Sequence, residues 1–155
     1  MDFIGIVGAR KYRDKESVVD FIRGLPADSV IVTSTCKGVC RWVVSAAKER
    51  GLAVKVFTPD LSNVQAKFEV AQRYYERNRQ LIDACDVVCA FVSEQAGFTG
   101  GTKFEVEYAL KLGKPVQLLW ESSISSNGAG KVALQIDKPE RFSNDWMSFF
   151  QKTFA

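Results

Sequence analysis

Short apolar runs alternate along the chain with segments whose apolar residues recur at helical spacing. The apolar runs predict strands at Phe3–Val7, Val30–Val32, Ala53–Phe57, Val87–Phe91 and Val116–Trp120. The segments between them predict helices after Asp14, at Val39–Arg50, at Asn63–Ala84, and after the glycine loop up to Leu112. Strands that are apolar on both faces and alternate with helices are typical of a parallel sheet covered on both sides. The sequence therefore predicts an α/β fold, a three-layer Rossmann-like sandwich with a mainly parallel five-stranded sheet.

The pattern changes at the C-terminal end of the chain, over residues 121–155. Val132–Ile136 is a candidate for an extra edge strand, and a candidate amphipathic helix rich in aromatic side chains starts at Ser143. Packing of this helix on the sheet is favoured, and a partner-binding or dimerisation helix is the alternative. We therefore expect residues 1–155 to form one domain, with residues 121–155 as an extension that packs on it.

Composition limits the classes of function that need to be considered. The chain has 155 residues, of which 46% are hydrophobic, and a net charge of +3. This is the balance of an ordinary globular domain, and the small net charge disfavours nucleic-acid binding through bulk electrostatics. No apolar run approaches the roughly 20 residues that span a bilayer, and no signal peptide is visible, so no membrane partner is predicted and a cytoplasmic location is the default expectation.

The chain contains no histidine, so acid–base chemistry must use other side chains. The four cysteines form two pairs, Cys36 with Cys40 and Cys85 with Cys89, each separated by three residues. Without histidine and with this spacing we expect no zinc site, and the sequence predicts no metal or other cofactor. Cys85 and Cys89 are expected to pack as small hydrophobes. Cys36 and Cys40 flank a candidate ligand loop, where a reactive thiol is the alternative to a packing role.

Polar segments follow the carboxyl ends of the predicted strands, where ligands bind in parallel sheets. These segments are Gly8–Arg10, Ser34–Gly38, Thr58–Asp60 and Gly97–Thr102. Glycine and hydroxyl residues ahead of a helix offer N–H groups to a phosphate or a ribose, and Lys37 and Arg41 add positive charge. Their convergence on one edge of the sheet predicts a small anionic, nucleotide-like ligand.

In these segments the chain resembles the SLOG superfamily, particularly its YspA/YpsA-like branch, with similarity to LOG phosphoribohydrolases and to the Rossmann domain of DprA. The matching stretches are Gly8–Asp14, Thr33–Arg41, Arg77-Asn78 ahead of Ala84–Phe91, and Gly100–Thr102 with Gly113–Val116. The resemblance implies a Rossmannoid domain that binds a nucleotide or a nucleotide-derived ligand and that forms a homo-oligomer. It also implies a catalytic role for Glu105, which stands where LOG enzymes and nucleoside deoxyribosyltransferases have a glutamate. The chain departs from the family at Ser34-Thr35 and Cys40, which replace a glycine pair and an aspartate.

Together these observations define a candidate site with Glu105 as its catalytic residue. The expected ligand-binding residues are Gly8, Ala9, Arg10, Ser34, Thr35, Lys37, Gly38, Arg41, Arg77, Asn78, Gly100, Gly101 and Thr102. Structural roles are the alternatives: Thr102 and Glu105 match a capping box, and Arg10, Arg77 and Asn78 suit solvated surfaces. Tyr74 and Tyr75 are candidates either for stacking on a base or for packing, and Asp60 either for binding ribose or for forming a turn.

Three functions compete at this point. The favoured one is binding of a nucleotide or ribosyl phosphate compound by a ligand-sensing protein. The alternative is an N-glycosidic bond hydrolase or transferase, whose oxocarbenium-like transition state the Glu105 carboxylate would stabilise. A single-stranded nucleic-acid binding module is the second alternative, which the scattered Lys and Arg residues disfavour.

Overall fold

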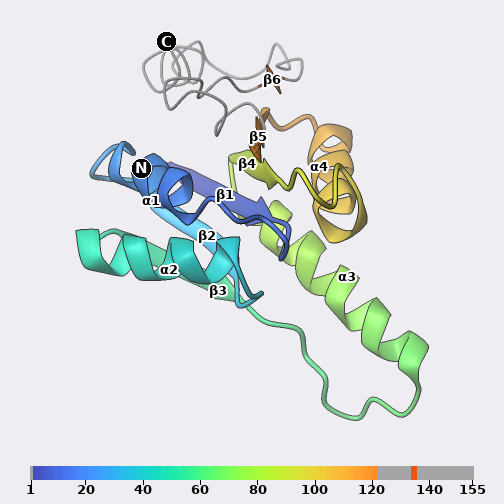
Figure 1. The fold of residues 1–155 in the computed structure, drawn as a ribbon. Coiled ribbons are helices and arrows are strands. Elements are labelled where there is room, and N and C mark those ends of the chain that lie inside the picture. Colours follow the sequence, from blue (N-terminus) through green and yellow to red (C-terminus); the bar gives the residue numbers. More distant parts are fainter. Residues whose placement is uncertain (1, 122–133, 136–155) are drawn as a thin grey trace.

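The computed structural model describes residues 2–121 and 134–135. Strands and helices alternate in the predicted order (Figure 1). The elements are β1 (Phe3–Gly8), α1 (Lys15–Arg23), β2 (Val30–Ser34), α2 (Val39–Arg50), β3 (Ala53–Phe57), α3 (Lys67–Asp83), β4 (Val87–Val92), α4 (Gly100–Lys111), β5 (Val116–Trp120) and β6 (Leu134–Gln135). The strand order is β3-β2-β1-β4-β5-β6; β1 to β5 are parallel, and β6 pairs antiparallel with β5. The predicted Rossmann-like architecture is confirmed.

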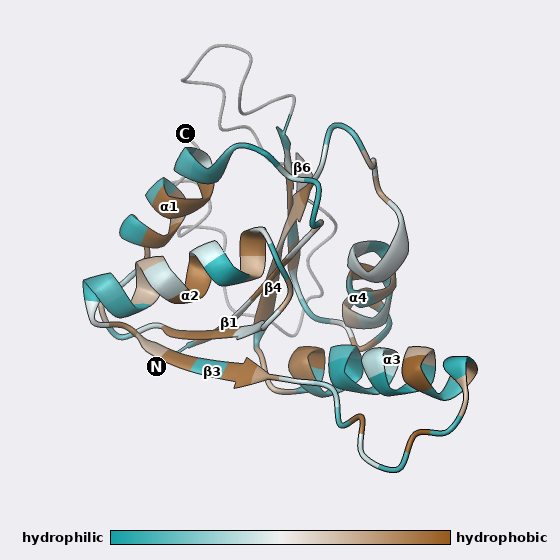
Figure 2. Cartoon of the chain, turned by 60° about the horizontal axis from the view of Figure 1, so that its bottom comes forward, coloured by the Kyte–Doolittle hydropathy of each residue, from teal (hydrophilic) through white to brown (hydrophobic). Residues whose placement is uncertain are grey.

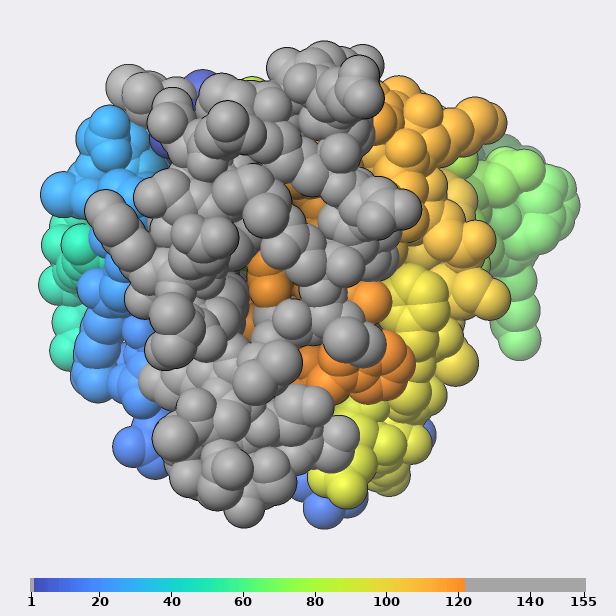
Figure 3. Space-filling view, turned by 90° about the horizontal axis from the view of Figure 1, so that it is seen from above, coloured from blue at the N-terminus to red at the C-terminus, as the bar shows by residue number. Residues whose placement is uncertain are grey.

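Helices cover both faces of the sheet. Figure 2 shows α1 and α2 on one face and α3 and α4 on the other. Seen from above, α1 and α2 lie on one side of β5 and α4 on the opposite side (Figure 3). β4 is buried along its whole length, and its side chains alternate between the two layers. Cys89 and Phe91 enter the core beneath α1 and α2, whereas Val88 and Ala90 enter the core beneath α3 and α4.

Local signals set the helix ends. The Asp14 side chain accepts a hydrogen bond from the Ser17 backbone N at 3.2 Å and caps α1, as predicted. Gly51 ends α2 in the left-handed conformation, with φ of 82°, also as predicted. The predicted start of α3 at Asn63 is wrong, because Asn63 has φ of 59°, which no right-handed helix accommodates. The helix begins instead at Lys67.

β2 extends two residues further than its apolar run predicted. Thr33 and Ser34 are buried in the strand, although they were expected in the following loop. Their hydroxyl groups are satisfied internally: Thr33 Oγ1 donates to the Ile6 carbonyl at 2.8 Å, and Ser34 Oγ donates to Cys40 Sγ at 3.3 Å. At the other edge, β6 lies inside the predicted Val132–Ile136 strand, whereas the helix expected from Ser143 falls outside the described residues.

A buried carboxylate joins the loops that follow β1 and β4. Glu121 comes directly after β5, and its Oε2 accepts hydrogen bonds from the backbone N–H groups of Arg13 at 2.6 Å and Asp14 at 3.0 Å. Its Oε1 accepts from the Glu94 backbone N–H at 2.9 Å. One side chain therefore holds together the loops that follow β1 and β4, the two strands between which the strand order reverses. Within residues 2–121, no helix is long and apolar enough to cross a membrane.

Candidate functional site

A pocket of about 540 Å³ opens at the carboxyl ends of β1 and β4. Strand order reverses between these two strands, which is where open α/β sheets bind ligands. The volume falls within the roughly 300–1,000 Å³ typical of small-molecule sites. The loop after β1, the loop after β2, α3, the loop after β4 and the start of α4 all contribute to the wall. The lining residues are Gly8, Ala9, Arg10, Lys11, Cys36, Ala71, Tyr74, Tyr75, Arg77, Asn78, Ala96, Thr99, Gly100, Gly101, Thr102 and Glu105.

Glu105 is the one carboxylate in this lining. The capping-box interpretation of Thr102 and Glu105 is wrong, because α4 starts at Gly100, with Thr99 at the N-cap position. Glu105 therefore lies in the second turn of the helix, where its carboxyl group has no helix-end N–H to satisfy. Its side chain is 8% exposed and lines the pocket. A buried carboxyl group without a capping role is the arrangement expected of a functional acid.

Burial raises the pKa of Glu105 to about 8. The positive charge of Arg77 lowers it and the Cys36 thiol raises it further, but both effects are smaller than the loss of hydration. The carboxyl group is therefore mostly protonated at neutral pH in the free protein. A bound cation or an electron-poor sugar carbon beside it would favour its ionised form.

Arg77 and Asn78 are each 5% exposed, so the solvated-surface interpretation of these two residues is wrong. Arg77 Nε donates to Asn78 Oδ1 at 2.8 Å, and the guanidinium carbon lies 5.3 Å from the centre of the Tyr74 ring. These contacts fix the guanidinium plane within the pocket wall. On the facing helix, Gly101 lies next to the Asn78 amide, whose nitrogen would be 3.7 Å from a Cβ at this position. α3 and α4 thus bring a buried cation and a buried acid to the same cavity.

The first turn of α4 supplies backbone donors to the pocket. Gly100, Gly101 and Thr102 form this turn and line the cavity, as predicted. The Thr99 hydroxyl donates to the Ala96 carbonyl at 3.1 Å and makes no capping hydrogen bond. Since the first N–H groups of a helix have no partner within it, they are available to an anion or a sugar oxygen.

The loop after β1 reaches the pocket with Gly8, Ala9 and Arg10, as predicted. Gly8 has a second role, because a Cβ there would come within 2.8 Å of the Val39 side chain on α2. Arg10 is exposed at the pocket, and Lys11 beside it also lines the wall, which the sequence analysis did not anticipate. Two exposed cations therefore stand at the rim.

The loop after β2 contributes less than predicted. The pocket lining does not include Ser34, Thr35, Lys37, Gly38 or Arg41. Ser34 is buried in β2, and Gly38, with φ of 82°, packs its backbone against that of Arg10. The physical reason is topological: β2 lies one strand away from the reversal between β1 and β4. Glycine- and hydroxyl-rich composition alone could not distinguish this loop from the two that border the reversal.

Cys36 is the residue of the β2 loop that does line the pocket. Arg77 Nη2 donates to Cys36 Sγ at 3.6 Å, and the Cys36 backbone N donates to Ser34 Oγ at 3.3 Å. A hydrogen bond from the Cys40 thiol lowers the pKa of Cys36 well below its ordinary value, with Ser34 and Arg77 adding to the effect. The signal for this thiol in the sequence was that Cys36 and Cys40 flank the candidate ligand loop.

Tyr74 and Tyr75 also line the pocket from α3. Tyr75 packs edge-on against Phe104 of α4, with ring centres 4.6 Å apart, and remains 41% exposed. Such a partly exposed aromatic surface at a pocket wall suits stacking of a base.

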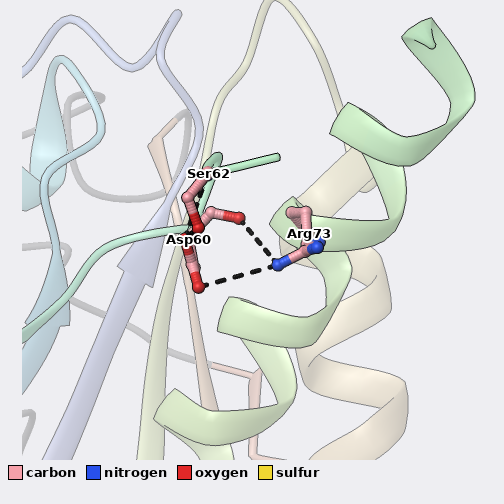
Figure 4. A network of polar contacts seen from close by, with 3 residues as sticks. All are labelled: Asp60, Ser62 and Arg73. Atoms are coloured by element: carbon pink, nitrogen blue, oxygen red, sulfur yellow. Dashed lines mark hydrogen bonds and ion pairs between the residues drawn. The ribbon is translucent and has the colours of Figure 1, made fainter. Parts of the chain in front are cut away.

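Asp60 belongs to a neighbouring depression of about 310 Å³, which shares Arg77 with the main pocket. Figure 4 shows how Arg73 of α3 holds it: Arg73 Nη1 lies 3.2 Å from the Asp60 carbonyl and 3.7 Å from Oδ2. Asp60 Oδ1 also accepts from the Ser62 backbone N at 3.0 Å. The geometry matches the expected turn, and the structure does not bring Asp60 to the main pocket.

A profile of the nucleoside 2-deoxyribosyltransferase family matches residues 37–143. The chain belongs to this family. The matched range includes α2, α3 and α4 with Arg77, Asn78 and Glu105, and so covers much of the pocket wall. Membership in the family links the pocket to nucleoside-type ligands and to glycosyl transfer, without fixing a particular substrate.

Among solved structures, the chain is similar to DNA processing protein A (DprA) from Streptococcus pneumoniae, with a TM-score of 0.61 and 22% sequence identity. The similarity covers 76% of this chain and 50% of that protein, so the chain matches about half of DprA. At this level of identity the likeness shows the fold alone. Both findings fit the SLOG-type superfamily. A comparison with curated proteins gave no significant match.

Proposed function

We propose that this protein cleaves or transfers the N-glycosidic bond of a nucleoside or nucleoside monophosphate, with Glu105 as the catalytic carboxylate. The observation that carries the proposal is the burial of Glu105 in a pocket that also holds a fixed guanidinium group and the free end of α4. The family of the chain supports the same chemistry. The finer placement in the YspA/YpsA-like branch of the SLOG superfamily is part of this proposal.

The reaction suits a carboxylate acting without histidine. The bond between C1′ of the sugar and the base nitrogen breaks, and its electron pair leaves with the base. Glu105 stabilises the oxocarbenium-like sugar and traps it through a bond from a carboxylate oxygen to C1′. Water or a second base then attacks C1′ and releases the carboxylate. Water gives hydrolysis and a second base gives transfer.

Positive groups at the pocket suit a phosphorylated substrate. Arg10 and Lys11 stand at the rim, and Arg77 lies inside. Together with the N–H groups of Gly100 and Gly101, they favour a 5′-phosphate over an uncharged sugar end. Tyr74 and Tyr75 supply the aromatic surface for the base. We therefore propose nucleoside monophosphates as the preferred class of substrate.

The raised pKa of Glu105 gives the reaction a specific pH dependence. The nucleophilic form is the carboxylate, which becomes the major form only above about pH 8 in the free protein. The value of kcat/KM should therefore rise with pH up to about 8 and then level off. A rate that falls over this range would indicate instead that Glu105 acts as a proton donor.

Binding without turnover is the second candidate function. The observation that favours it is the protonated state of Glu105 at neutral pH, which suits a hydrogen-bond donor to a ligand. In that case the same pocket would serve a nucleotide sensor. Thermal-shift measurements with nucleotides, cyclic nucleotides, ADP-ribose derivatives and nucleosides would detect binding in either case. A panel without any shift would contradict both functions.

Release of free base from nucleosides, deoxynucleosides and their monophosphates tests the catalytic proposal. Glu105→Gln keeps the size of the side chain and removes its charge, so base release should fall by at least about a hundredfold. Glu107→Gln is the matched control, because Glu107 is exposed on the same helix and does not line the pocket. Equal rates in wild type and Glu105→Gln would overturn the role of Glu105. Ligand binding without base release in wild type would establish the sensor.

A further inference from the structure

Two cysteines, Cys36 and Cys40, both contact Ser34 at the edge of the pocket. Cys36, in the loop after β2, lines the cavity and is half-buried, whereas Cys40, in the first turn of α2, is buried behind it. The interaction between the two side chains lowers the pKa of Cys36 and raises that of Cys40. Ser34 lies against both: its hydroxyl donates to Cys40 Sγ at 3.3 Å and accepts from the Cys36 backbone N at 3.3 Å.

The surroundings of Cys36 stabilise a thiolate. The Arg77 guanidinium donates to its sulfur at 3.6 Å. The N-terminus of α2 begins three residues further on, with Gly38 as its cap and no acidic residue in its first turn. Among the residues that line the pocket with Cys36, Glu105 is the one with a carboxyl group, and burial keeps it mostly protonated. A thiolate beside a cation and a helix N-terminus, and open to a cavity, is the reactive form of cysteine.

The other two cysteines have the opposite environment. Cys85 and Cys89 are buried against β1 and in β4, and burial raises the pKa of both thiols. They remain neutral and shielded from solvent, so they are inert toward oxidants that require a thiolate. Cys85 and Cys89 therefore serve as unreactive controls, within the same chain, for the pair of Cys36 and Cys40.

We propose that Cys36 and Cys40 form a site of reversible oxidation by hydroperoxides, in which Cys36 reacts first and Cys40 closes a disulfide. The Cys36 thiolate attacks one peroxide oxygen, the O–O bond breaks, and with one proton the products are Cys36 sulfenic acid and, from hydrogen peroxide, water. An organic hydroperoxide would release an alcohol in place of this water. The Cys40 sulfur then attacks the Cys36 sulfur. The thiol proton of Cys40 leaves with the hydroxide of the sulfenic acid as a second water. Two electrons pass from the thiol pair to the peroxide.

Oxidation changes the pocket itself. The disulfide removes the negative sulfur that accepts the hydrogen bond from Arg77, so the guanidinium loses this bond and keeps the one to Asn78. Arg77 and Glu105 then face a neutral disulfide in the cavity wall. This oxidation is independent of any reaction at a glycosidic bond, and its test does not depend on the proposed function.

Trypsin provides a direct test on the full chain, because Lys37 lies between the two cysteines. Cleavage separates Cys36, in the peptide Gly24–Lys37, from Cys40, in the peptide Gly38–Arg41. The folded protein is treated with hydrogen peroxide, its remaining thiols are alkylated, and the digest is analysed by mass spectrometry. The disulfide should hold the two peptides together as one species that a reductant separates. Cys85 and Cys89, which share another peptide, should be oxidised at least about tenfold more slowly.

Two variants distinguish the steps. Cys40→Ser keeps a hydroxyl donor beside Cys36 but cannot close the bond, so Cys36 should accumulate as sulfenic acid and be trapped by dimedone. Cys36→Ser should leave Cys40 reduced at the same dose. Circular dichroism before and after treatment shows that each protein stays folded. The proposal is overturned if wild type yields no linked peptides, or if Cys85 and Cys89 react as fast as Cys36.

Discussion

Folding keeps the Glu105 carboxyl group protonated at pH values at which it would be ionised in the unfolded chain. Burial raises its pKa from 4.5 to about 8, against the weaker attraction of Arg77. Because the folded state holds the proton more tightly, this contribution to stability is complete below pH 4.5 and is lost as the pH rises through about 8. The free energy of unfolding should therefore fall by about 3–4 kcal/mol between pH 5 and pH 8.

Urea unfolding of wild type, Glu105→Gln and Glu107→Gln at several pH values would measure this effect. In the Glu105→Gln protein, the free energy of unfolding should depend much less on pH. This protein should be more stable than wild type at pH 8, since it buries no ionisable group at position 105. The Glu107→Gln protein should retain the slope of wild type. A slope shared by all three proteins would show that Glu105 is not its source.

Arg10 tests the proposed preference for phosphate. It is exposed at the pocket rim, so Arg10→Gln should leave the fold intact. Loss of a charge-assisted contact should raise KM for a nucleoside monophosphate by about tenfold and leave KM for the matching nucleoside unchanged. Arg41→Gln is the control, because Arg41 is exposed but does not line the pocket. If Arg10→Gln raised KM equally for the nucleoside monophosphate and the nucleoside, Arg10 would not bind the phosphate.

Among the secondary-structure elements, β1 and α2 pack closely at Gly8, which has no side chain. A Cβ at Gly8 would lie 2.8 Å from three carbon atoms of Val39, so Gly8→Ala should destabilise the protein by about 1–3 kcal/mol. Gly24→Ala is the matched control: Gly24 has φ of −85°, and a Cβ there would meet nothing closer than 3.6 Å. It should change stability by less than about 1 kcal/mol. Thermal unfolding of the two variants measures both effects, and equal melting temperatures would contradict the close contact.

The elements themselves could largely be predicted from the sequence. Apolar runs identified β1 to β5. A strand buried on both faces, such as β4, needs apolar side chains in succession. The edge strand β3 was found by the same pattern although it is largely exposed. Capping residues identified the start of α1 at Asp14 and the end of α2 at Gly51. Prediction failed where a polar side chain found an internal partner, as with Thr33 and Ser34, or where one residue took a left-handed conformation, as with Asn63.

The candidate site was only partly predictable. Loops bordering the strand-order reversal were found, because glycine ahead of a helix is visible in the sequence. The loop after β2 has the same composition, and only the order of strands in space removes Lys37 and Arg41 from the pocket. The burial of Arg77 and Glu105 depends on how α3 and α4 approach each other, which no local pattern encodes.

For the whole molecule, α3 extends beyond the sheet (Figure 1), and this helix and the segment before it carry exposed apolar side chains. Phe68 and Tyr75 of α3 are 65% and 41% exposed, and Leu61 in the preceding segment is 44% exposed. Such a group of side chains suits contact with another protein surface. We therefore expect a homo-oligomer, and light scattering after size-exclusion chromatography should give a mass of at least a dimer. Phe68→Glu should lower that mass, whereas Lys67→Glu beside it should not. A wild-type monomer would contradict the expectation.

The placement of Glu121 has a consequence for how the binding preference of this protein can change. Glu121 joins the loops after β1 and β4 from a position outside the main pocket, through the backbone N–H groups of Arg13, Asp14 and Glu94. Backbone groups are the same whatever the side chains are, so the scaffold of the site is independent of the residues that select the ligand. Evolution or an engineer can therefore exchange side chains such as Arg10 or Tyr74 and obtain a new specificity on an unchanged frame.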